Sequence, residues 1–242
     1  MKNTFYRFEF KYRIPQWKLR GFEFDCLQLG LERDPNSSYI VSSLYFDKPV
    51  LLPDYDDKAG GFLRRKKVRA RIYGETIDNI DGVWLEIKEK YDMMIYKRRI
   101  IISVSEWNEL LKLYTINNAL RRRLNDKERR ILEEFIFDIA SVGRRPHILV
   151  SYKRKPFFYY FGSRKVRLTL DYQISALSTS RFGLIKKPMD VLSGWAVIEL
   201  KYNEFLPVAI RCLIEKYNLG RDAYSKYALG VEAVRWFNVP AR

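Results

Sequence analysis

Apolar and polar residues alternate along several segments of the chain, and this pattern predicts β-strands that have one apolar face and one charged face. The clearest case is KKVRARIYG, residues 66–74, in which Lys67, Arg69 and Arg71 alternate with apolar residues. The same alternation recurs in several other segments, at residues 7–14, 83–90, 166–171 and 197–202. Another strand is predicted from about His147, and it places Tyr152 and Arg154 on one face.

Helices are predicted between these strands from amphipathic spacing and from residues that favour helix ends. Ser103 followed by Glu106 has the spacing of a capping box. The predicted helices run from Pro15 toward Leu31, from Ser103 through Leu113, from Asp126 to Ile139, from Pro207 through about Tyr217, and from a cap at Asp222 toward Phe237.

The charged faces of the predicted strands carry both signs, and the apolar faces match the predicted helices. A single such strand is typical of a solvated outer surface, with its apolar residues buried. Their recurrence favours a closed antiparallel β-barrel with a polar lumen and with helices packed outside it. The fold class is therefore expected to be α+β, formed by one domain that spans residues 1–242. Arg69 and Arg71 are expected to line the lumen.

The charge of the chain points to anionic partners. With 45 Lys and Arg against 29 Asp and Glu, its formal net charge is +16, which favours nucleic acid, anionic membrane or phosphate-rich small molecules. Zinc is disfavoured because there is one histidine and no CxxC motif. Cys26 and Cys212 are expected to be buried free thiols. No apolar run reaches the roughly 20 residues needed to span a bilayer. The expected free thiols indicate a reducing compartment, so a cytoplasmic protein is expected.

Ordered motifs along the chain resemble the polyphosphate polymerase domain of the vacuolar transporter chaperone (VTC) family, within the triphosphate tunnel metalloenzymes. The resemblance runs nearly end to end. The motifs that carry it are RFEFKY (7–12), SSLYFD (42–47), KKVRARIYG (66–74), LEIKEK (85–90), KRR (97–99), YKRKPF (152–157), VRLTLD (166–171), VIELKY (197–202) and SKYALG (225–230).

The resemblance implies a tunnel of about eight strands that holds a triphosphate. It implies transfer of the terminal phosphoryl group of ATP to growing polyphosphate, with Mn²⁺ or Mg²⁺ as cofactor. The implied catalytic cations are Arg69, Arg71, Lys97, Arg154 and Arg167. The implied substrate-binding residues are Lys11, Lys88, Lys201, Ser225 and Lys226. Glu199 is the main expected metal ligand, followed by Glu86 and Glu9, which could equally serve to hold neighbouring cations in place.

One departure separates this chain from other tunnel enzymes. Many of them carry two glutamates in an ExExK first strand, whereas Arg7 stands here in place of the first glutamate, before Glu9 and Lys11. The VTC-type pattern is therefore favoured over the triphosphatase and cyclase patterns. The chain also has no Walker A motif, which excludes a P-loop kinase.

Two other classes of function stay open. A non-catalytic module that binds polyphosphate or inositol phosphates would keep the basic lumen and could lose the metal carboxylate. Nucleic acid is not expected as the main ligand, because the cations alternate with apolar residues in strands rather than gathering in one arm or helix. Coupling to transport would require a separate membrane protein as partner.

Overall fold

The computed structural model describes residues 7–49, 52–78, 80–91, 94–115, 118–183 and 186–237. The chain forms two compact units. The first comprises Met1–Ile40, Tyr152–Ile174 and Asp190–Ser225; the second comprises Val41–Ser151, Ser175–Met189 and Lys226–Arg242. Two long strands, β7 (Arg145–Phe161) and β8 (Arg164–Ser178), pass from one unit into the other and contribute a part to each.

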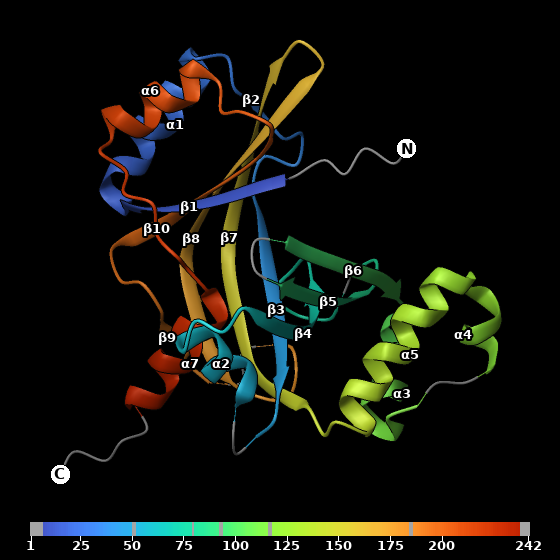
Figure 1. Cartoon of the computed structure of the whole chain (residues 1–242). Coiled ribbons are helices and arrows are strands. Elements are labelled where there is room, and N and C mark those ends of the chain that lie inside the picture. Colours follow the sequence, from blue (N-terminus) through green and yellow to red (C-terminus); the bar gives the residue numbers. More distant parts are fainter. Residues whose placement is uncertain are drawn as a thin grey trace. The chain divides into compact units, whose positions relative to one another are not determined.

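The first unit is built on an antiparallel sheet. Its strands pair in the order β1 (Arg7–Pro15), β10 (Trp195–Asn203), β8 and β7, with the short β2 (Glu32–Arg33) on β7. The 3₁₀ turn Gln16–Lys18 leads from β1 into α1 (Leu19–Gln28), which lies beside α6 (Val208–Lys216) (Figure 1). The core of this unit joins the apolar faces of the strands to α1 and α6, through Phe22, Leu168, Leu200 and Ile210 among others.

The second unit contains the antiparallel strands of the central part of the chain. In it β7 is followed by β3 (Tyr39–Asp47), β4 (Arg64–Ile72), β5 (Val83–Tyr91) and β6 (Met94–Ile102), and β9 (Met189–Asp190) pairs with β8. The pairings of β3 with β4, β4 with β5 and β5 with β6 are antiparallel.

Helices cover the apolar face of β4, β5 and β6. They are α3 (Val104–Leu113), α4 (Asn118–Arg123) and α5 (Asp126–Ala140), which group together in Figure 1. Capping boxes begin α3 at Ser103 and α5 at Asn125, where side chains satisfy backbone groups that have no partner within the helix. The helices α2 (Pro53–Ala59) and α7 (Lys226–Phe237) complete the unit.

The predicted pattern of strand faces is confirmed, and so is the antiparallel α+β class. Val68, Ala70 and Ile72 are fully buried in the core, while Arg69 and Arg71 point to the opposite face. The closed barrel is not confirmed: in the described part of the chain, pairing ends at β1 in the first unit and at β6 in the second. The single-domain prediction stays a prediction.

The helix predicted from Pro15 toward Leu31 is confirmed over residues 16–28, although Pro15 itself is the last residue of β1. Two other local predictions were wrong. Asp222 caps no helix, because α7 begins at Lys226 and Asp222 forms an ion pair with Arg13 at 2.9 Å. Both cysteines are free, but only Cys26 is buried; Cys212 is exposed.

Candidate functional site

The second unit carries a strongly basic sheet surface. Cross-strand partners point to the same face of a sheet, and the register places Arg69 opposite Glu86 and Glu86 opposite Arg99. The next row joins Lys67 to Lys88 and Lys88 to Lys97. We call this surface the basic face; its charged residues are Arg65, Lys67, Arg69, Arg71, Glu86, Lys88, Lys90, Lys97 and Arg99.

Glu86 is the anchor of the basic face. Its carboxylate is 1% exposed and contacts cations from both neighbouring strands. Arg69 donates through Nε at 2.7 Å and places a second nitrogen 2.6 Å from the same oxygen. Lys97 Nζ lies 2.5 Å from the other oxygen, and Arg71 lies 3.8 Å away. This arrangement favours the role of holding cations in place over the role of metal ligand, the two roles that the sequence left open.

Two polar residues of β3 orient the arginines from the other side. Arg69 donates to the Tyr45 hydroxyl at 2.9 Å, and Arg71 donates through Nε to Ser43 Oγ at 3.0 Å. Each pair sits at matched positions of β3 and β4. Neither Ser43 nor Tyr45 was assigned a role from the sequence, although both lie in the SSLYFD motif. The arginines are therefore held on two sides before any ligand arrives.

The electrostatics of this cluster are shaped by burial and by the density of positive charge. Burial alone would raise the pKa of Glu86, but Arg69, Arg71 and Lys97 together hold it well below its usual range. Burial, and then the charge of Arg69, lowers the pKa of Lys97 to about 7. Because 37% of the Lys97 side chain is exposed, solvent screens part of that effect.

The start of α7 adds a further set of contacts to this unit. The ring of Tyr227 lies 5.0 Å from that of Tyr45, and Lys67 Nζ lies 4.9 Å above it. The Tyr227 hydroxyl donates to Asp47, which also accepts from the backbone N–H groups of Asp54 and Tyr55. This packing fixes the helix turn that begins at Lys226, a residue that is 9% exposed.

The first unit carries a polar sheet surface of different composition. We call it the mixed-charge face; its residues are Glu9 and Lys11 of β1, Glu199 and Lys201 of β10, Arg167, Thr169 and Asp171 of β8, and Arg154 of β7. The register places Lys11 opposite Glu199, Glu9 opposite Lys201, and Lys201 opposite Arg167. Cations and carboxylates are therefore opposite each other on β1 and β10, whereas Lys201 lies opposite a second cation on β8.

Lys201 forms ion pairs with two carboxylates. It contacts Glu199 directly and lies 3.7 Å from Glu9, which is also 3.3 Å from Lys11. Lys11 donates in addition to the Tyr224 carbonyl at 3.0 Å. Glu9 and Glu199 therefore both lie within 4.0 Å of one ammonium group. Carboxylate oxygens are the donors that Mn²⁺ and Mg²⁺ prefer, so these two residues have the donor chemistry that a divalent metal requires.

Arg154 and Arg167, both predicted as catalytic, lie in different surroundings. Arg154 forms a bidentate pair with Asp171, at 2.6 and 2.8 Å, and both residues are buried. Arg167 donates to the Tyr39 hydroxyl at 3.4 Å, and its guanidinium lies 5.8 Å from the Phe158 ring. Asp171 was not recognised from the sequence as the partner of Arg154. The pair holds Arg154 rigidly on the mixed-charge face.

The structure brings the predicted residues together in two sets. Arg69, Arg71, Lys88, Lys97 and Glu86 share the basic face, and Lys226 belongs to the same unit. The mixed-charge face holds Glu9, Lys11, Arg154, Arg167, Glu199 and Lys201. Ser225 belongs to the first unit and directly precedes α7.

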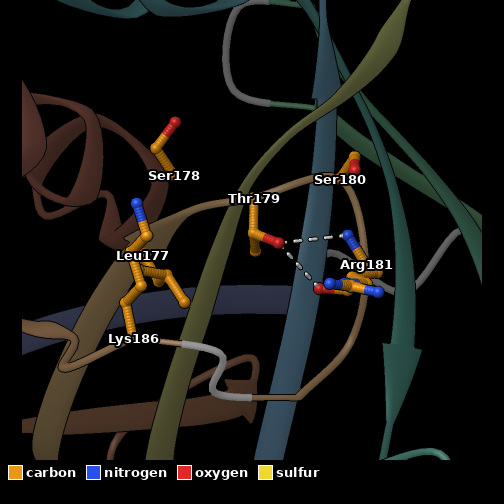
Figure 2. Close-up of a pocket in the computed structure, with 6 residues that line it drawn as sticks. All are labelled: Leu177, Ser178, Thr179, Ser180, Arg181 and Lys186. Atoms are coloured by element: carbon orange, nitrogen blue, oxygen red, sulfur yellow. Dashed lines mark hydrogen bonds between the residues drawn. The ribbon is translucent and has the colours of Figure 1, made fainter.

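A separate hollow of about 390 Å³ lies at the end of β8 in the second unit. It is lined by Leu177, Ser178, Thr179, Ser180, Arg181 and Lys186 (Figure 2). Thr179 Oγ1 accepts from the Arg181 backbone N–H at 3.3 Å, which closes a local turn (Figure 2). The hollow contains none of the predicted site residues.

The chain matches the family model of the VTC domain over residues 7–235. No curated protein matches it. Within the described residues, no helix is both long and apolar enough to cross a membrane.

Solved structures with a similar course of the chain share little sequence identity with it. One is a candidate adenylate cyclase from Bacillus halodurans, 9% identical, covering 90% of this chain and 92% of that one at a TM-score of 0.46. Another is a candidate adenylate cyclase from Vibrio parahaemolyticus, 13% identical, covering 93% and 97% at 0.48. A Mimivirus capping enzyme triphosphatase is 8% identical and covers 87% and 88% at 0.34. These TM-scores are too low to carry a conclusion about fold or function.

Proposed function

The chain belongs to the VTC domain family, and we propose that it is a polyphosphate polymerase. It would transfer the terminal phosphoryl group of ATP to a growing polyphosphate chain with the help of Mn²⁺ or Mg²⁺. The observation that carries this proposal is the basic face. On that face of the described strands β4 to β6, Glu86 is the one carboxylate among many lysines and arginines. Such an excess of fixed positive charge is suited to a polyanionic substrate.

Phosphoryl transfer depends mainly on positioning and on neutralising charge, which matches what these residues can do. Arg69 is held by Glu86 and Tyr45, and Arg71 by Ser43, so their guanidinium groups need little reorganisation when phosphate binds. Lys97 and Lys88 add compact charges in the neighbouring row. The acceptor phosphate would attack the terminal phosphorus of ATP directly, ADP would leave, and no enzyme nucleophile would be required.

Glu199 and Glu9 are the residues that would hold the metal in this proposal. When bound, the metal would neutralise charge on the phosphate oxygens. Lys201 contacts both carboxylates, keeps them close together and offsets their mutual repulsion. Glu86 is not assigned to the metal, because Arg69, Arg71 and Lys97 already surround its carboxylate.

A non-catalytic module that binds polyphosphate is the second candidate. It is favoured by one observation: the residues that the structure describes contain no group of three or more acidic, histidine or cysteine side chains arranged to hold a metal. Glu199, the expected main ligand, is paired with Lys201. A tunnel triphosphatase would use similar cations but would release orthophosphate.

The substitution Glu199→Gln separates the enzyme from the binding module, because it keeps the side-chain shape and removes the charge. In the polymerase it should leave triphosphate binding intact or stronger without metal, since one negative charge is removed. It should also reduce metal-dependent turnover, because the activation free energy should rise by roughly 2–4 kcal/mol, as expected when one important electrostatic stabiliser is lost. Calorimetry of triphosphate binding with and without Mn²⁺, together with ADP release, measures both effects.

The matched control is Glu23→Gln, which removes a carboxylate of the same unit that is paired with Lys155 away from the mixed-charge face. Turnover of this control should equal that of the parent. Full turnover and an unchanged metal dependence in Glu199→Gln would remove Glu199 from the site and would favour the binding module.

A further inference from the structure

The segment that contains α1 exposes large apolar side chains where a surface helix normally has polar ones. Trp17 is 79% exposed, Phe24 is 60% exposed and Leu27 is 37% exposed. Spacings of three, four and seven residues place all three on one side of the helical segment, together with Arg20 and Gln28, which are also exposed. We call these five residues the α1 outer face.

The opposite side of α1 packs into the core of the first unit, so the apolar residues of the α1 outer face are not part of that core. Phe22 and Cys26 are buried in the core of the first unit. Gly21 lets the helix approach α6 closely, because a Cβ there would lie 3.2 Å from the Tyr217 hydroxyl. The orientation of α1 is therefore fixed by its inner side, and the exposure of Trp17 and Phe24 follows from it.

The charges around this surface are positive. The acidic residues of α1 are both engaged at its flanks: Glu23 accepts from Lys155 at 2.8 Å, and Asp25 accepts from Tyr217 and contacts Lys216, each at 2.7 Å. None of the exposed residues from 17 to 28, all of which the structure describes, is acidic. The cations of this surface are the exposed Arg20 and the half-buried Lys18, whose ammonium group lies 5.2 Å from the Trp17 ring.

The helix α5 in the second unit provides an internal contrast. Phe137 is 58% exposed there, close to the value for Phe24, but the other strongly exposed positions of that helix include Lys127, Arg130 and Glu133. A single exposed aromatic among charges is ordinary for a protein surface. A tryptophan, a phenylalanine and a leucine aligned beside cations are typical of a helix that lies in a membrane interface.

We propose that the α1 outer face docks on the surface of a lipid bilayer that contains anionic lipids. Trp17 and Phe24 would enter the boundary between headgroups and acyl chains, while Arg20 and Lys18 would contact phosphate groups. A second copy of the chain fits less well, because pairing two such faces would bring the same cations together in a molecule of net charge +16. An anionic bilayer attracts this charge instead.

The test measures co-sedimentation of the purified chain with phosphatidylcholine vesicles, with and without phosphatidylglycerol. We expect binding that requires phosphatidylglycerol and that falls by about tenfold or more in Trp17→Ala/Phe24→Ala, because two rings lose their burial. The matched control Phe137→Ala should bind like the parent. Thermal unfolding of the double variant should be unchanged, since both rings are exposed in the chain alone.

A second readout does not depend on truncating the surface. Fluorescence of the parent should shift to the blue and be quenched by brominated acyl chains when vesicles are added, and Trp17→Phe should lose most of this response while keeping vesicle affinity. The proposal is overturned if the parent does not bind the vesicles or if the double variant binds as well as the parent. It is also overturned if light scattering shows a dimer of the parent that the double variant abolishes, because the face would then be covered by a second copy.

Discussion

The basic face and the mixed-charge face are both built on antiparallel strands of alternating pattern, but they differ in how positive charge is balanced. On the mixed-charge face, Glu9, Glu199 and Asp171 lie among Lys11, Lys201, Arg154 and Arg167. Lys11, Lys201 and Arg154 each form an ion pair with one of these carboxylates. On the basic face, Glu86 is shared by Arg69, Arg71 and Lys97. The same alternation therefore produces one nearly neutral surface and one with a large excess of positive charge.

Because of this difference, the two faces are suited to different ligands. A surface with excess charge gains most from a polyanion, because ligand binding relieves repulsion among its cations. A surface with converging carboxylates can also hold a metal cation. The basic face is therefore suited to binding phosphate, and Glu9 and Glu199 of the mixed-charge face are suited to binding a metal.

The largest expected effect is on stability, through the anchor of the basic face. Glu86→Gln should lower the free energy of unfolding by about 3–5 kcal/mol, because it leaves buried cations without their partner. Tripolyphosphate should restore part of this loss by supplying negative charge. Denaturant unfolding with and without tripolyphosphate measures both quantities.

The matched control is Glu89→Gln, whose carboxylate is 32% exposed and is paired with Arg98 on the other side of the same strand. Its loss should be at most about 1 kcal/mol. Equal losses in the two variants would contradict the role of Glu86 as anchor.

The next effect is on turnover. Arg69→Ala and Arg71→Ala should each reduce kcat/KM by about 10²–10³, as expected when one fixed donor is lost from a site that stabilises developing charge. Arg98→Ala is the control, since Arg98 points to the side of the sheet where it pairs with Glu89 and Glu134. Parent-like turnover in both Arg69→Ala and Arg71→Ala would remove the basic face from the reaction.

The smallest effect concerns pH and Lys97. Its pKa is lowered to about 7 in the free protein, so the lysine loses its charge as the pH rises through 7. Bound triphosphate favours the charged form and raises this pKa, so affinity should fall between pH 6 and 9 and binding at pH 8 should take up a proton. Calorimetry in buffers of different ionisation enthalpy measures the uptake. Lys97→Met should abolish it, and an unchanged uptake in that variant would assign the proton to another group.

The strand faces could be predicted from the sequence because an alternating pattern fixes which side chains share a face, whatever the partner strands are. Capping residues likewise gave the start of α3 at Ser103. Both signals are local, and local signals were sufficient to group Arg69 with Arg71 and Glu199 with Lys201.

Features that depend on long-range contacts were missed. Tyr45 and Ser43 orient the arginines across a strand pair, and Asp171 holds Arg154 from β8, which no local spacing indicates. Aspartate is a residue type that favours helix N-caps, but the carboxylate of Asp222 forms an ion pair with Arg13 instead. The short helix α2 was not predicted, because seven residues give too little periodicity.

The most direct test of the proposed function is incubation of the purified chain with ATP and Mn²⁺ or Mg²⁺, followed by measurement of ADP, orthophosphate and polyphosphate. If the chain is a polymerase, ADP and polymeric phosphate should appear together, with one phosphoryl group entering the polymer for each ADP released. Tight binding of triphosphate without any release of ADP would contradict the polymerase and favour a binding module. Release of orthophosphate without polymer would instead identify a triphosphatase.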